Sequence, residues 1–562
     1  MDPRQERVDA IRERSTDLEN HLIDELRAGK IGRREFVQRG GIIGMSIPLL
    51  GWIATACGVS REDLEKADKP QTAKPKPGGT IRIGQQAPAG ELDPVTVNNQ
   101  GGLTLLGQTG EYLIWSDREL NPVPRLAESW KPNEDGSVWT FKLRQGVKFH
   151  DGKTMDAEDV ASSFDRLADP DNGSNALSAF TGVLSKGGAK AVDASTVEFS
   201  LDAPNGNFPY LTSSDNYNAI ILPKDFDGDW EKSWIGTGPW KLGEFRPAEG
   251  VSLVPNEDYW APGRRANAEK VEVVFYANEP GLVLGFQGNE VDVVVQFSVS
   301  GGKALLTEPS VVTTELRSAA HRQVHLRGDK EPFLDKRVRQ AVALLVDRVA
   351  LVDGLLDTKS DYGNDSPFAP VYRSTAKVEQ RQRDVAQAKE LLRAAGKEDG
   401  FSVGLTTWQG FEMPDLAQLM QQNVREAGIR LELSITDSAT YYGEATYGNS
   451  PWLDSTMGIT EYGHRGVPNV VLGAPLLSDG TWNGAHFKNK QYDSLVKDYV
   501  AAVDLDVQRR TSRQIQELLK DESPVLFPYF YYFLSGAKDY IAGVETNAMG
   551  HTDVSRAGLT NT

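Results

Sequence analysis

Hydrophobic and polar residues alternate most regularly between residues 127 and 167. After an Asn-Glu-Asp-Gly turn, apolar side chains recur at every second position, at Trp139, Phe141 and Leu143. This period predicts a strand with one buried face, and Trp130 begins its hairpin partner. Beyond a second turn, Val160, Phe164 and Leu167 follow the period of a helix, which Thr154 or Asp156 is placed to cap. We expect a hairpin that leads into a helix.

The second half of the chain alternates between helical and strand patterns. Asp335 is placed to cap a helix whose apolar face carries Val338, Val342, Leu345 and Val349. Further on, the pattern predicts helices over 386–395 and 416–427 and strands over 401–406 and 429–435. Alternation of this kind predicts an α/β lobe with a largely parallel sheet.

Shorter apolar runs complete the pattern. Residues 271–276 and 291–295 predict two strands that flank a helix, and residues 219–222 predict a short buried strand. Two helices are expected around residues 492–499 and 515–519. The aromatic run over 525–533 predicts a core strand whose rings serve packing before ligand contact.

Composition narrows the possible functions. The chain has 562 residues, with 79 acidic against 61 basic side chains and a formal net charge of −18. This length corresponds to three or four units of roughly 150 residues. The negative charge opposes general binding to nucleic acid or anionic lipid. Cys57 is the one cysteine, so no disulfide forms within the chain and the fold depends on packing.

The first 57 residues have the pattern of an export signal. Arg33 and Arg34 precede an uncharged stretch, residues 40–56, which is shorter than the roughly 20 residues that a membrane span needs. The paired arginines resemble a twin-arginine signal, and the small residues before Cys57 resemble a lipoprotein box. Lipid on Cys57 is therefore expected to anchor the protein, with an uncleaved amphipathic anchor as the alternative. Residues 58–79, rich in charge and proline, are expected to form a flexible tether.

Catalytic motifs are scarce. Gly152 and Lys153, followed by a threonine, have the pattern that ends a phosphate-binding loop. Such a loop has four residues between its two glycines, whereas five residues separate Gly146 from Gly152. The chain has no Gly-x-Ser-x-Gly motif, no paired cysteines and no His-Glu-x-x-His spacing. His321 and His325 are four residues apart, but they lie in an expected strand. There this spacing puts both side chains on one face and does not form the metal clamp that it forms on a helix. A catalytic pair of carboxylates of the glycosidase type stays an open alternative, because the sequence does not give the distance between two carboxylates in space.

Three motifs are found in a set order. The first is the succession 127–130, 141–144, 149–152 and 157–160, which reads Ala-x-x-Trp, Phe-x-Leu-Arg, Phe-His-Asp-Gly and Ala-Glu-Asp-Val. The second is Gly-Thr-Gly-Pro at 236–239 with Asn-x-x-Tyr-Trp at 256–260, and the third is Val-Arg-Gln-Ala at 338–341. Together they resemble the family 5 solute-binding proteins, the peptide and nickel receptors of ABC importers.

This resemblance, which runs from about residue 80 to residue 545, implies a type II periplasmic-binding-protein fold of the α/β class. In that fold two lobes are joined by a hinge, and an additional domain is inserted in the first lobe. The expected division is lobe 1 at 80–105, 230–325 and 520–562, the additional domain at 106–229, and lobe 2 at 326–519.

The resemblance also implies a ligand site on the second lobe. Trp408 lies where family members often carry an aromatic residue, after a strand, and further aromatic candidates are Tyr441, Tyr442, Tyr447, Trp452, Tyr462 and Trp482. In peptide-binding relatives, an aspartate a few residues before a proline pairs with the amino terminus of the ligand. The matching stretch, 458–468, has no aspartate, so Glu461 is expected in this role, and Arg465 is a candidate to face an anionic ligand.

The function implied is that of a receptor and not of an enzyme. We expect a lipid-anchored, monomeric extracytoplasmic protein that captures a small ligand and delivers it to ABC permease subunits in the membrane. An oligopeptide or dipeptide is the expected ligand, without cofactor, metal ion or nucleic acid. The alternatives are a non-peptide solute (an oligosaccharide, an opine or a nickel chelate), an extracellular hydrolase on the same scaffold, and an adhesion or sensory protein without transport.

Overall fold

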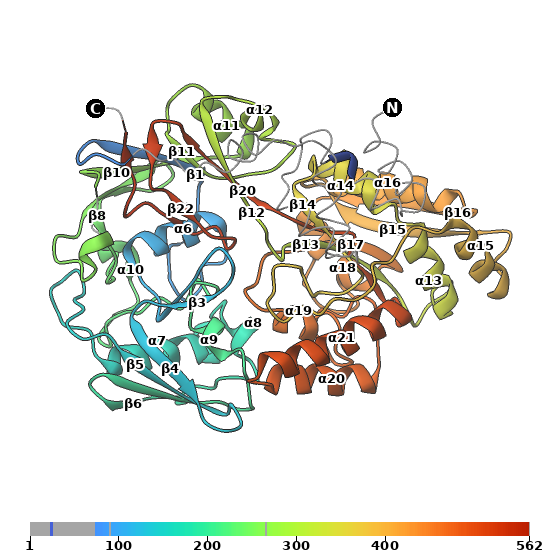
Figure 1. The fold of residues 1–562 in the computed structure, drawn as a ribbon, viewed down its shortest axis with the longest axis horizontal. Coiled ribbons are helices and arrows are strands. Elements are labelled where there is room, and N and C mark those ends of the chain that lie inside the picture. Colours follow the sequence, from blue (N-terminus) through green and yellow to red (C-terminus); the bar gives the residue numbers. More distant parts are fainter. Residues whose placement is uncertain (1–22, 26–73, 89–90, 265–266, 561–562) are drawn as a thin grey trace, which may run out of the picture.

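Two lobes lie side by side, each built on a seven-stranded sheet (Figure 1). The computed structural model describes residues 23–25, 74–88, 91–264 and 267–560. Arg33, Arg34, Cys57 and most of the expected tether lie outside these residues. Within them, no helix has the length and apolarity to cross a membrane.

The first sheet has the strand order β12-β20-β11-β1-β10-β9-β8. Its strands are β1 (Thr80–Gln86), β8 (Trp240–Arg246), β9 (Gly250–Pro255), β10 (Lys270–Tyr276), β11 (Val293–Phe297), β12 (Val311–Leu316) and β20 (Phe533–Lys538). The central strand β1 is parallel to both β10 and β11, because α11 (Glu279–Gln287) returns the chain between them. The predicted strand-helix-strand unit is thus confirmed.

The additional sheet below the first one is antiparallel, in the order β4-β5-β7-β6. Its strands are β4 (Ala127–Pro132), β5 (Val138–Leu143), β6 (Ala189–Asp193) and β7 (Thr196–Ser200). The predicted helix is α7 (Ala157–Ala168), and its cap is Asp156, whose carboxylate accepts from the backbone amides of Glu158 and Asp159. Phe164 packs edge-on against Phe199 with ring centroids 5.0 Å apart. Burying each such ring stabilises the domain by roughly 1.5–3 kcal/mol.

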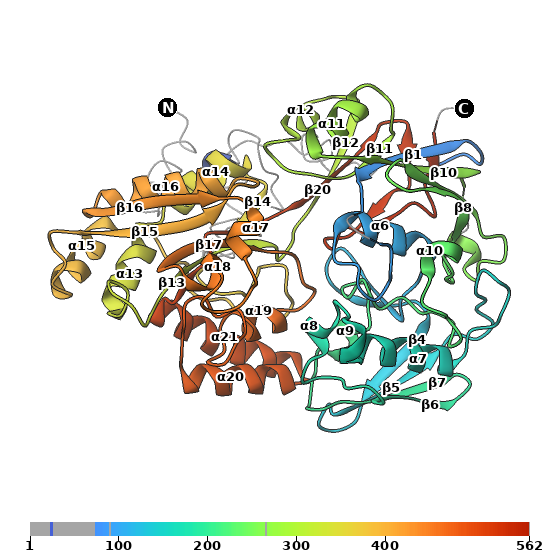
Figure 2. The same ribbon diagram turned by 180° about the vertical axis from the view of Figure 1, so that it is seen from behind.

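The second sheet has the order β14-β19-β13-β17-β15-β16, with β18 also paired to β13. Its strands are β13 (His321–Leu326), β14 (Ser360–Tyr362), β15 (Phe401–Trp408), β16 (Ile429–Thr436), β17 (Met457–Tyr462), β18 (Val525–Leu526) and β19 (Tyr529–Tyr531). Strand β15 is parallel to β16 and β17, as the alternating pattern predicts. The accompanying helices are α13 (Lys336–Leu345), α14 (Arg348–Leu356), α15 (Val385–Ala394) and α16 (Met413–Arg425), seen from behind in Figure 2.

The remaining elements are mostly short. The helices are α6 (Gln100–Thr109), α8 (Leu177–Phe180), α9 (Phe208–Leu211), α10 (Trp230–Ser233), α12 (Lys303–Leu306), α17 (Ser438–Tyr442), α18 (Pro451–Asp454), α19 (Asn469–Gly473), α20 (Lys490–Ala501) and α21 (Leu505–Glu522), with 3₁₀ turns at Pro170–Asn172 and Pro262–Arg264. The strands are β2 (Ile114–Ser116), β3 (Pro122–Pro124), β21 (Ile541–Ala542), β22 (Glu545–Thr546), β23 (Thr552–Asp553) and β24 (Gly558–Leu559).

Three elements differ from the sequence prediction. The helix capped by Asp335 ends at Leu345, and Val349 belongs to α14, because Asp347 caps a new helix. The aromatic run over 525–533 is divided among β18, β19 and the start of β20. Residues 219–222 are buried as predicted, but they do not form a strand. The amide of Ile221 donates to the Glu111 carbonyl.

The chain crosses between the two sheets twice within the described residues. One crossing, 317–320, joins β12 to β13, and the other, Tyr532, joins β19 to β20. The lobe boundaries derived from the sequence stay a prediction. Strands β18 and β19 pair in the second sheet, so the chain returns to the first sheet only after residue 531. A change of sheet within an unbroken aromatic run has no signature in the hydrophobic pattern.

The crossings are bonded to each other and to β14. The Arg317 guanidinium pairs with the buried Asp361 carboxylate at 2.7 Å, and the Tyr532 hydroxyl donates to the same carboxylate at 3.3 Å. The Ser318 hydroxyl donates to the Tyr531 carbonyl at 2.6 Å. We call residues 317–320 and 532 together the hinge.

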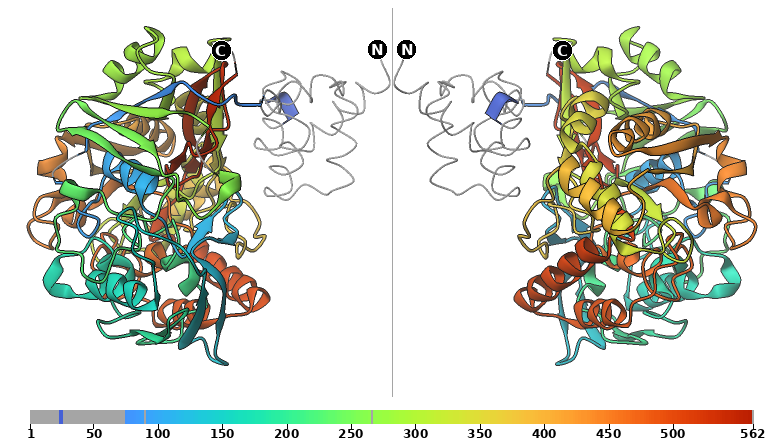
Figure 3. Two further views of the ribbon diagram at one scale, coloured as in Figure 1. Left: turned by 90° about the vertical axis from the view of Figure 1, so that its left-hand side faces the viewer. Right: turned by 90° about the vertical axis from the view of Figure 1, so that its right-hand side faces the viewer.

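The lobes also meet far from the hinge, where the helical hairpin α20–α21 reaches the additional domain (Figure 1). In the side views of Figure 3, the hairpin and the additional domain both lie toward the lower end of the molecule. The Gly206 amide donates to the Val500 carbonyl at 2.9 Å. The Asn207 side chain donates to Asn469 at 2.9 Å and accepts from Gln508 at 3.0 Å. A Cβ atom at Gly206 would overlap the carbonyl oxygen of Ala502, so this glycine permits the close approach. We call this region the distal contact.

Candidate functional site

Aromatic side chains form a continuous chain on the second lobe, from Trp408 at the end of β15 to Tyr462 at the end of β17. Ring centroids are 6.2 Å apart between Trp408 and Tyr442, and 5.3 Å apart between Tyr442 and Trp452. Trp482 lies 6.1 Å from both Trp452 and Tyr462. Of the candidates named from the sequence, Trp408, Tyr442, Trp452, Tyr462 and Trp482 are therefore gathered in one cluster, in which Trp408 and Trp482 are partly exposed and Tyr462 is buried.

Glu461 lies opposite Arg322 in the pairing of β17 with β13. The Arg322 guanidinium is buried, and it binds the Glu461 carboxylate at 3.2 Å and the Glu412 carboxylate at 2.9 Å. The Tyr531 ring lies 4.4 Å from this guanidinium, and the Tyr529 hydroxyl donates to Glu412 at 2.9 Å. Two carboxylates thus share one cation, which leaves this group with a net charge of −1 when both are ionised.

Arg322 offsets the cost of burial for the two carboxylates to different degrees. Burial alone would raise the pKa of Glu412, but the Arg322 guanidinium holds that pKa below its ordinary value. Burial raises the pKa of Glu461, and attraction to Arg322 only partly opposes this change. The Glu461 side chain also keeps 28% of its surface exposed, against 11% for Glu412. Glu461 is therefore the carboxylate with spare capacity for a further cation.

Arg465 lies in the loop that follows β17, and this loop contacts the first half of the chain. The Arg465 guanidinium donates to the His464 carbonyl at 2.9 Å. A Cβ atom at the next residue, Gly466, would overlap the carboxylate of Asp215, so only glycine fits this approach. The Asp215 Oδ2 atom is buried and has no hydrogen-bond partner among the described residues. Burial raises the pKa of Asp215 to about 7, and Ser116, Ser213 and Arg465 offset this only partly.

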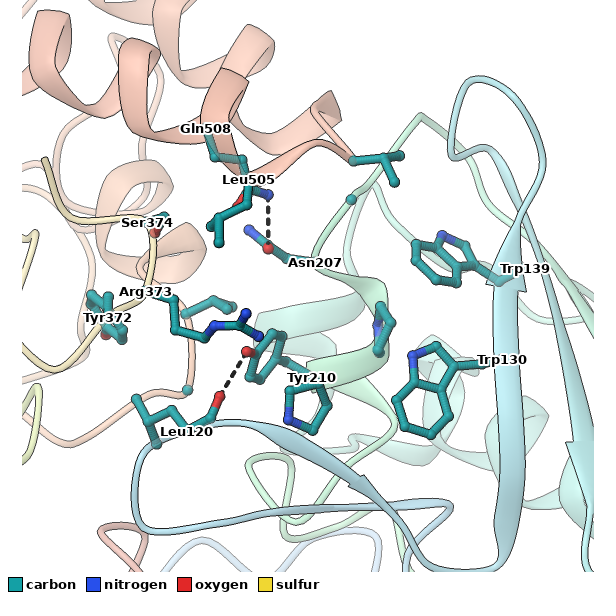
Figure 4. A pocket seen from close by; sticks show the side chains of 16 residues that line it. Leu120, Trp130, Trp139, Asn207, Tyr210, Tyr372, Arg373, Ser374, Leu505 and Gln508 are labelled. Carbon is teal, nitrogen blue, oxygen red and sulfur yellow. Dashed lines mark hydrogen bonds between the residues drawn. The ribbon is translucent and has the colours of Figure 1, made fainter.

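A cavity of about 210 Å³ lies between the additional domain and the second lobe (Figure 4). It is lined by Leu120, Pro122, Trp130, Trp139, Gly206, Asn207, Pro209, Tyr210, Tyr372, Arg373, Ser374, Gly466, Val467, Val503, Leu505 and Gln508. None of the ligand-binding candidates named from the sequence lines it. The loop of Arg465 links them to the cavity, because Gly466 and Val467, the next two residues, belong to its lining.

Sequence reasoning missed Arg322, Asp215 and Arg373. Arg322 has a signal that was available, since an arginine within the buried strand His321–Leu326 needs an anionic partner. Asp215 and Arg373 lie in loops without periodicity, so only the tertiary structure brings Asp215 against Gly466 and Arg373 into the lining of the cavity.

The two histidines considered for metal binding are both buried in β13. His321 bonds to the Ala319 carbonyl through Nδ1, and His325 bonds to the Ser455 carbonyl through Nε2. Burial lowers the pKa of both, to about 3 and about 4 respectively. In the described part of the chain, no group of three or more histidine, cysteine or acidic side chains is arranged to hold a metal ion.

The model of the bacterial extracellular solute-binding proteins, family 5 Middle, matches residues 121–461. The chain belongs to this family. The resemblance inferred from the three motifs is thereby confirmed, and the family places the protein's function outside the cytoplasm. Its members and structural neighbours are substrate-binding transport proteins and not enzymes.

Curated relatives of this family 5 protein bind different ligands. Oligopeptide-binding protein AppA of Bacillus subtilis is 24% identical over 510 residues, which cover 86% of this chain and 91% of AppA. Heme-binding protein A of Haemophilus influenzae is 23% identical over 431 residues, covering 71% and 77%. The periplasmic binding protein DppA of Helicobacter pylori, solved with the peptide STSA, has a TM-score of 0.69 at 21% identity, covering 86% and 99%. This likeness confirms the two-lobe type II fold.

Proposed function

We propose that this family 5 protein is a receptor for oligopeptides or dipeptides that hands its ligand to the permease of an ABC transporter. The arrangement that carries the proposal is the sharing of Arg322 between Glu412 and Glu461. A site with one carboxylate in excess favours a cation, and the amino terminus of a peptide supplies an ammonium group with three donors. Relatives with peptide-binding names support the same conclusion.

The remaining ligand contacts follow from the neighbours of Glu461. Trp408, Tyr462 and Trp482 offer aromatic surface on the same lobe, and Arg465 offers a cation near the first lobe. A ligand that touches both lobes stabilises the closed arrangement by its differential affinity for that arrangement. The hinge is the pivot for this movement, and the distal contact is the part that separates.

The proposal includes the location of the protein. The expected export signal with Arg33 and Arg34 would carry the chain across the membrane, and lipid on Cys57 would hold it there as a monomer. The flexible tether over 58–79 would give the lobes freedom to reach the permease.

The proposal can be tested by isothermal titration calorimetry, which measures the affinity for free peptides and for the same peptides acetylated at the amino terminus. We expect free peptides to bind and acetylated ones to bind at least tenfold more weakly, because charge-assisted hydrogen bonds are lost. Glu461→Gln should abolish this preference. The matched control is Glu432→Gln on β16, an exposed glutamate of the same lobe. Equal binding of free and acetylated peptides by the wild type would refute the role of Glu461, and turnover of any ligand into product would refute the receptor.

A further inference from the structure

The loop after β15 carries an exposed aromatic residue in an unfavourable backbone conformation. Phe411 has a φ of +47°, in the left-handed region that bulky residues rarely adopt, and it is 56% exposed. Neither feature stabilises the fold, because a left-handed residue with a Cβ atom is strained and an exposed ring buries little surface. Backbone strain that persists in a folded protein is concentrated at functional sites. Phe411 is therefore a candidate for a role other than folding.

The Phe411 ring lies over the buried group that contains Glu461. Its centroid is 5.2 Å from the guanidinium carbon of Arg322, and the ring of Tyr531 is 4.4 Å from the same carbon. The Arg322 side chain keeps only 3% of its surface exposed, whereas Phe411 is open to solvent. Phe411 thus forms the outer cover of this guanidinium.

The loop holds the ring in this position. The Met413 amide donates to the Gly410 carbonyl at 3.1 Å, which closes a turn around Phe411. A Cβ atom at Gly410 would overlap the ring of Trp408, so this glycine lets the chain pass closely by that ring. Phe411 then packs edge-on against Trp408, with ring centroids 5.9 Å apart. The turn and the close approach together fix the place of the cover.

A cover of this kind changes the electrostatics of the group beneath it. Arg322, Glu412 and Glu461 carry a net charge of −1 when both carboxylates are ionised. Where a ring keeps water away from such a group, the effective dielectric constant is lower and the attraction for a further cation is stronger. Salt ions are also kept at a distance, so they screen this attraction less. Glu461 itself stays 28% exposed, which leaves it accessible to a cation.

We propose that Phe411 determines specificity by keeping water from the group of Arg322, Glu412 and Glu461, which increases the affinity of this group for a ligand cation over a neutral ligand. With respect to the ligand, this rests on the proposed function, under which the cation is the amino terminus of a peptide. The ring acts through the charged group and does not require contact with the ligand. The benefit of a strained and exposed phenylalanine is thus realised when a cation binds, and not when the chain folds.

Exchange of the Arg322 Nε–H proton with solvent measures the cover without any ligand. In NMR of the full-length protein labelled with ¹⁵N-arginine, we expect this proton to exchange about tenfold faster in Phe411→Ala than in the wild type. Phe411→Leu should restore most of the protection. The matched control is Leu334→Ala, since Leu334 is an apolar residue of the second lobe that is 58% exposed, and it should leave the exchange rate unchanged. Equal rates in the wild type and Phe411→Ala would overturn the proposal.

A small probe measures the effect on cation binding. Alaninamide carries a free amino group without a carboxylate, and N-acetylalaninamide is its neutral counterpart. In NMR titrations we expect the wild type to prefer alaninamide, and Phe411→Ala to bind it about tenfold more weakly and with a steeper dependence on salt. Phe411→Leu should restore both properties. Phe411→Gly should bind as weakly as Phe411→Ala but have a higher Tm, because glycine relieves the strained φ, so folding and binding are separated.

Peptides separate this proposal from the proposed function. No binding of alaninamide to the wild type, or equal or tighter binding to Phe411→Ala, would overturn the role of Phe411. If free peptides bind through Glu461 with the same affinity in the wild type and Phe411→Ala, the role of Phe411 is wrong and the peptide receptor stands. If Phe411→Ala weakens alaninamide binding while no peptide binds to the wild type, the role of Phe411 stands and the peptide receptor is wrong.

Discussion

The lobes are joined by the hinge at one end and by the distal contact at the other, and the two regions differ in kind. The hinge consists of continuous backbone, and its bonds include the buried pair between Arg317 and Asp361. The distal contact includes three hydrogen bonds at Gly206 and Asn207 and has no ion pair among the described residues. One region joins the lobes through the chain itself, whereas the other joins them through non-covalent contacts alone.

This difference indicates how ligand binding can control whether the lobes are closed or apart. Three neutral hydrogen bonds contribute about 1 kcal/mol each, so the distal contact alone stabilises closure by only a few kcal/mol. A ligand that contacts both lobes adds free energy of the same size and thereby shifts the equilibrium. The buried pair at the hinge is not exchanged in this movement, because Arg317 and Asp361 both lie at the pivot.

The largest effect should come from Asp361→Ala, which removes the carboxylate that pairs with Arg317 and accepts from Tyr532. We expect the free energy of unfolding to fall by about 3 kcal/mol, the size typical of breaking a buried ion pair. Urea denaturation measures this, with Asp479→Ala, an exposed aspartate, as a control that changes by less than about 0.5 kcal/mol. A loss below about 1 kcal/mol for Asp361→Ala would show that the hinge does not depend on this pair.

Gly206→Ala should act on closure and not on folding. The added methyl group would overlap the Ala502 carbonyl and force the lobes apart, so we expect ligand affinity to fall about tenfold, equal to about 1.4 kcal/mol. The radius of gyration from small-angle scattering should no longer decrease when ligand is added. In Gly354→Ala on α14, where the new Cβ atom meets nothing within 4 Å, affinity and compaction should equal those of the wild type. Normal ligand-induced compaction of Gly206→Ala would contradict the role of the distal contact.

Asn207→Ala should give a smaller change in the same direction. It removes the side-chain hydrogen bonds to Asn469 and Gln508, and at about 0.5 kcal/mol for each of these two neutral bonds we expect ligand affinity to fall about fivefold. Asn172→Ala removes a single exposed bond within the additional domain, and it should leave affinity unchanged. Equal affinities for the two variants would show that these bonds do not contribute to closure.

Closure should also depend on pH. Burial against Gly466 raises the pKa of Asp215 to about 7, above the ordinary value of 3.8. A raised carboxyl pKa means that the closed arrangement favours the protonated form, so closure weakens as pH rises from about 4 to 7 and then stays constant. Scattering of the ligand-free protein should therefore show a more compact molecule at pH 5.5 than at pH 8. Asp215→Asn should lose this difference, and its persistence in that variant would exclude Asp215 as the cause.

Local patterns predicted the elements well where a single segment determines its own structure. The cap at Asp156 and the strand-helix-strand unit around α11 follow from spacing alone. The end of α13 at Leu345 did not, because two consecutive helices share one apolar period until Asp347 caps the second. The crossing at Tyr532 could not be predicted either, because the buried aromatic run continues from β19 into β20 without a break.

The candidate site could be predicted only in part. Trp408 was identified at the end of an expected strand, with Tyr462 and Trp482 as further aromatic candidates of the same lobe, and the structure gathers the three in one cluster. The environment of Glu461 depends on Arg322, which is 139 residues away in sequence and adjacent only through the pairing of β13 with β17. Asp215, which lies against the loop of Arg465, and Tyr210, which is hydrogen-bonded to Arg373, both come from the additional domain, and no local pattern specifies such contacts.

The most direct test of the receptor is native mass spectrometry of the protein purified from cells grown in rich medium, followed by fragmentation of whatever denaturation releases. Our account predicts a series of peptide masses on the wild type and their loss in Glu461→Gln, with both proteins folded. A single non-peptide mass, such as a sugar, an opine or a metal chelate, or peptides retained undiminished by Glu461→Gln, would contradict it.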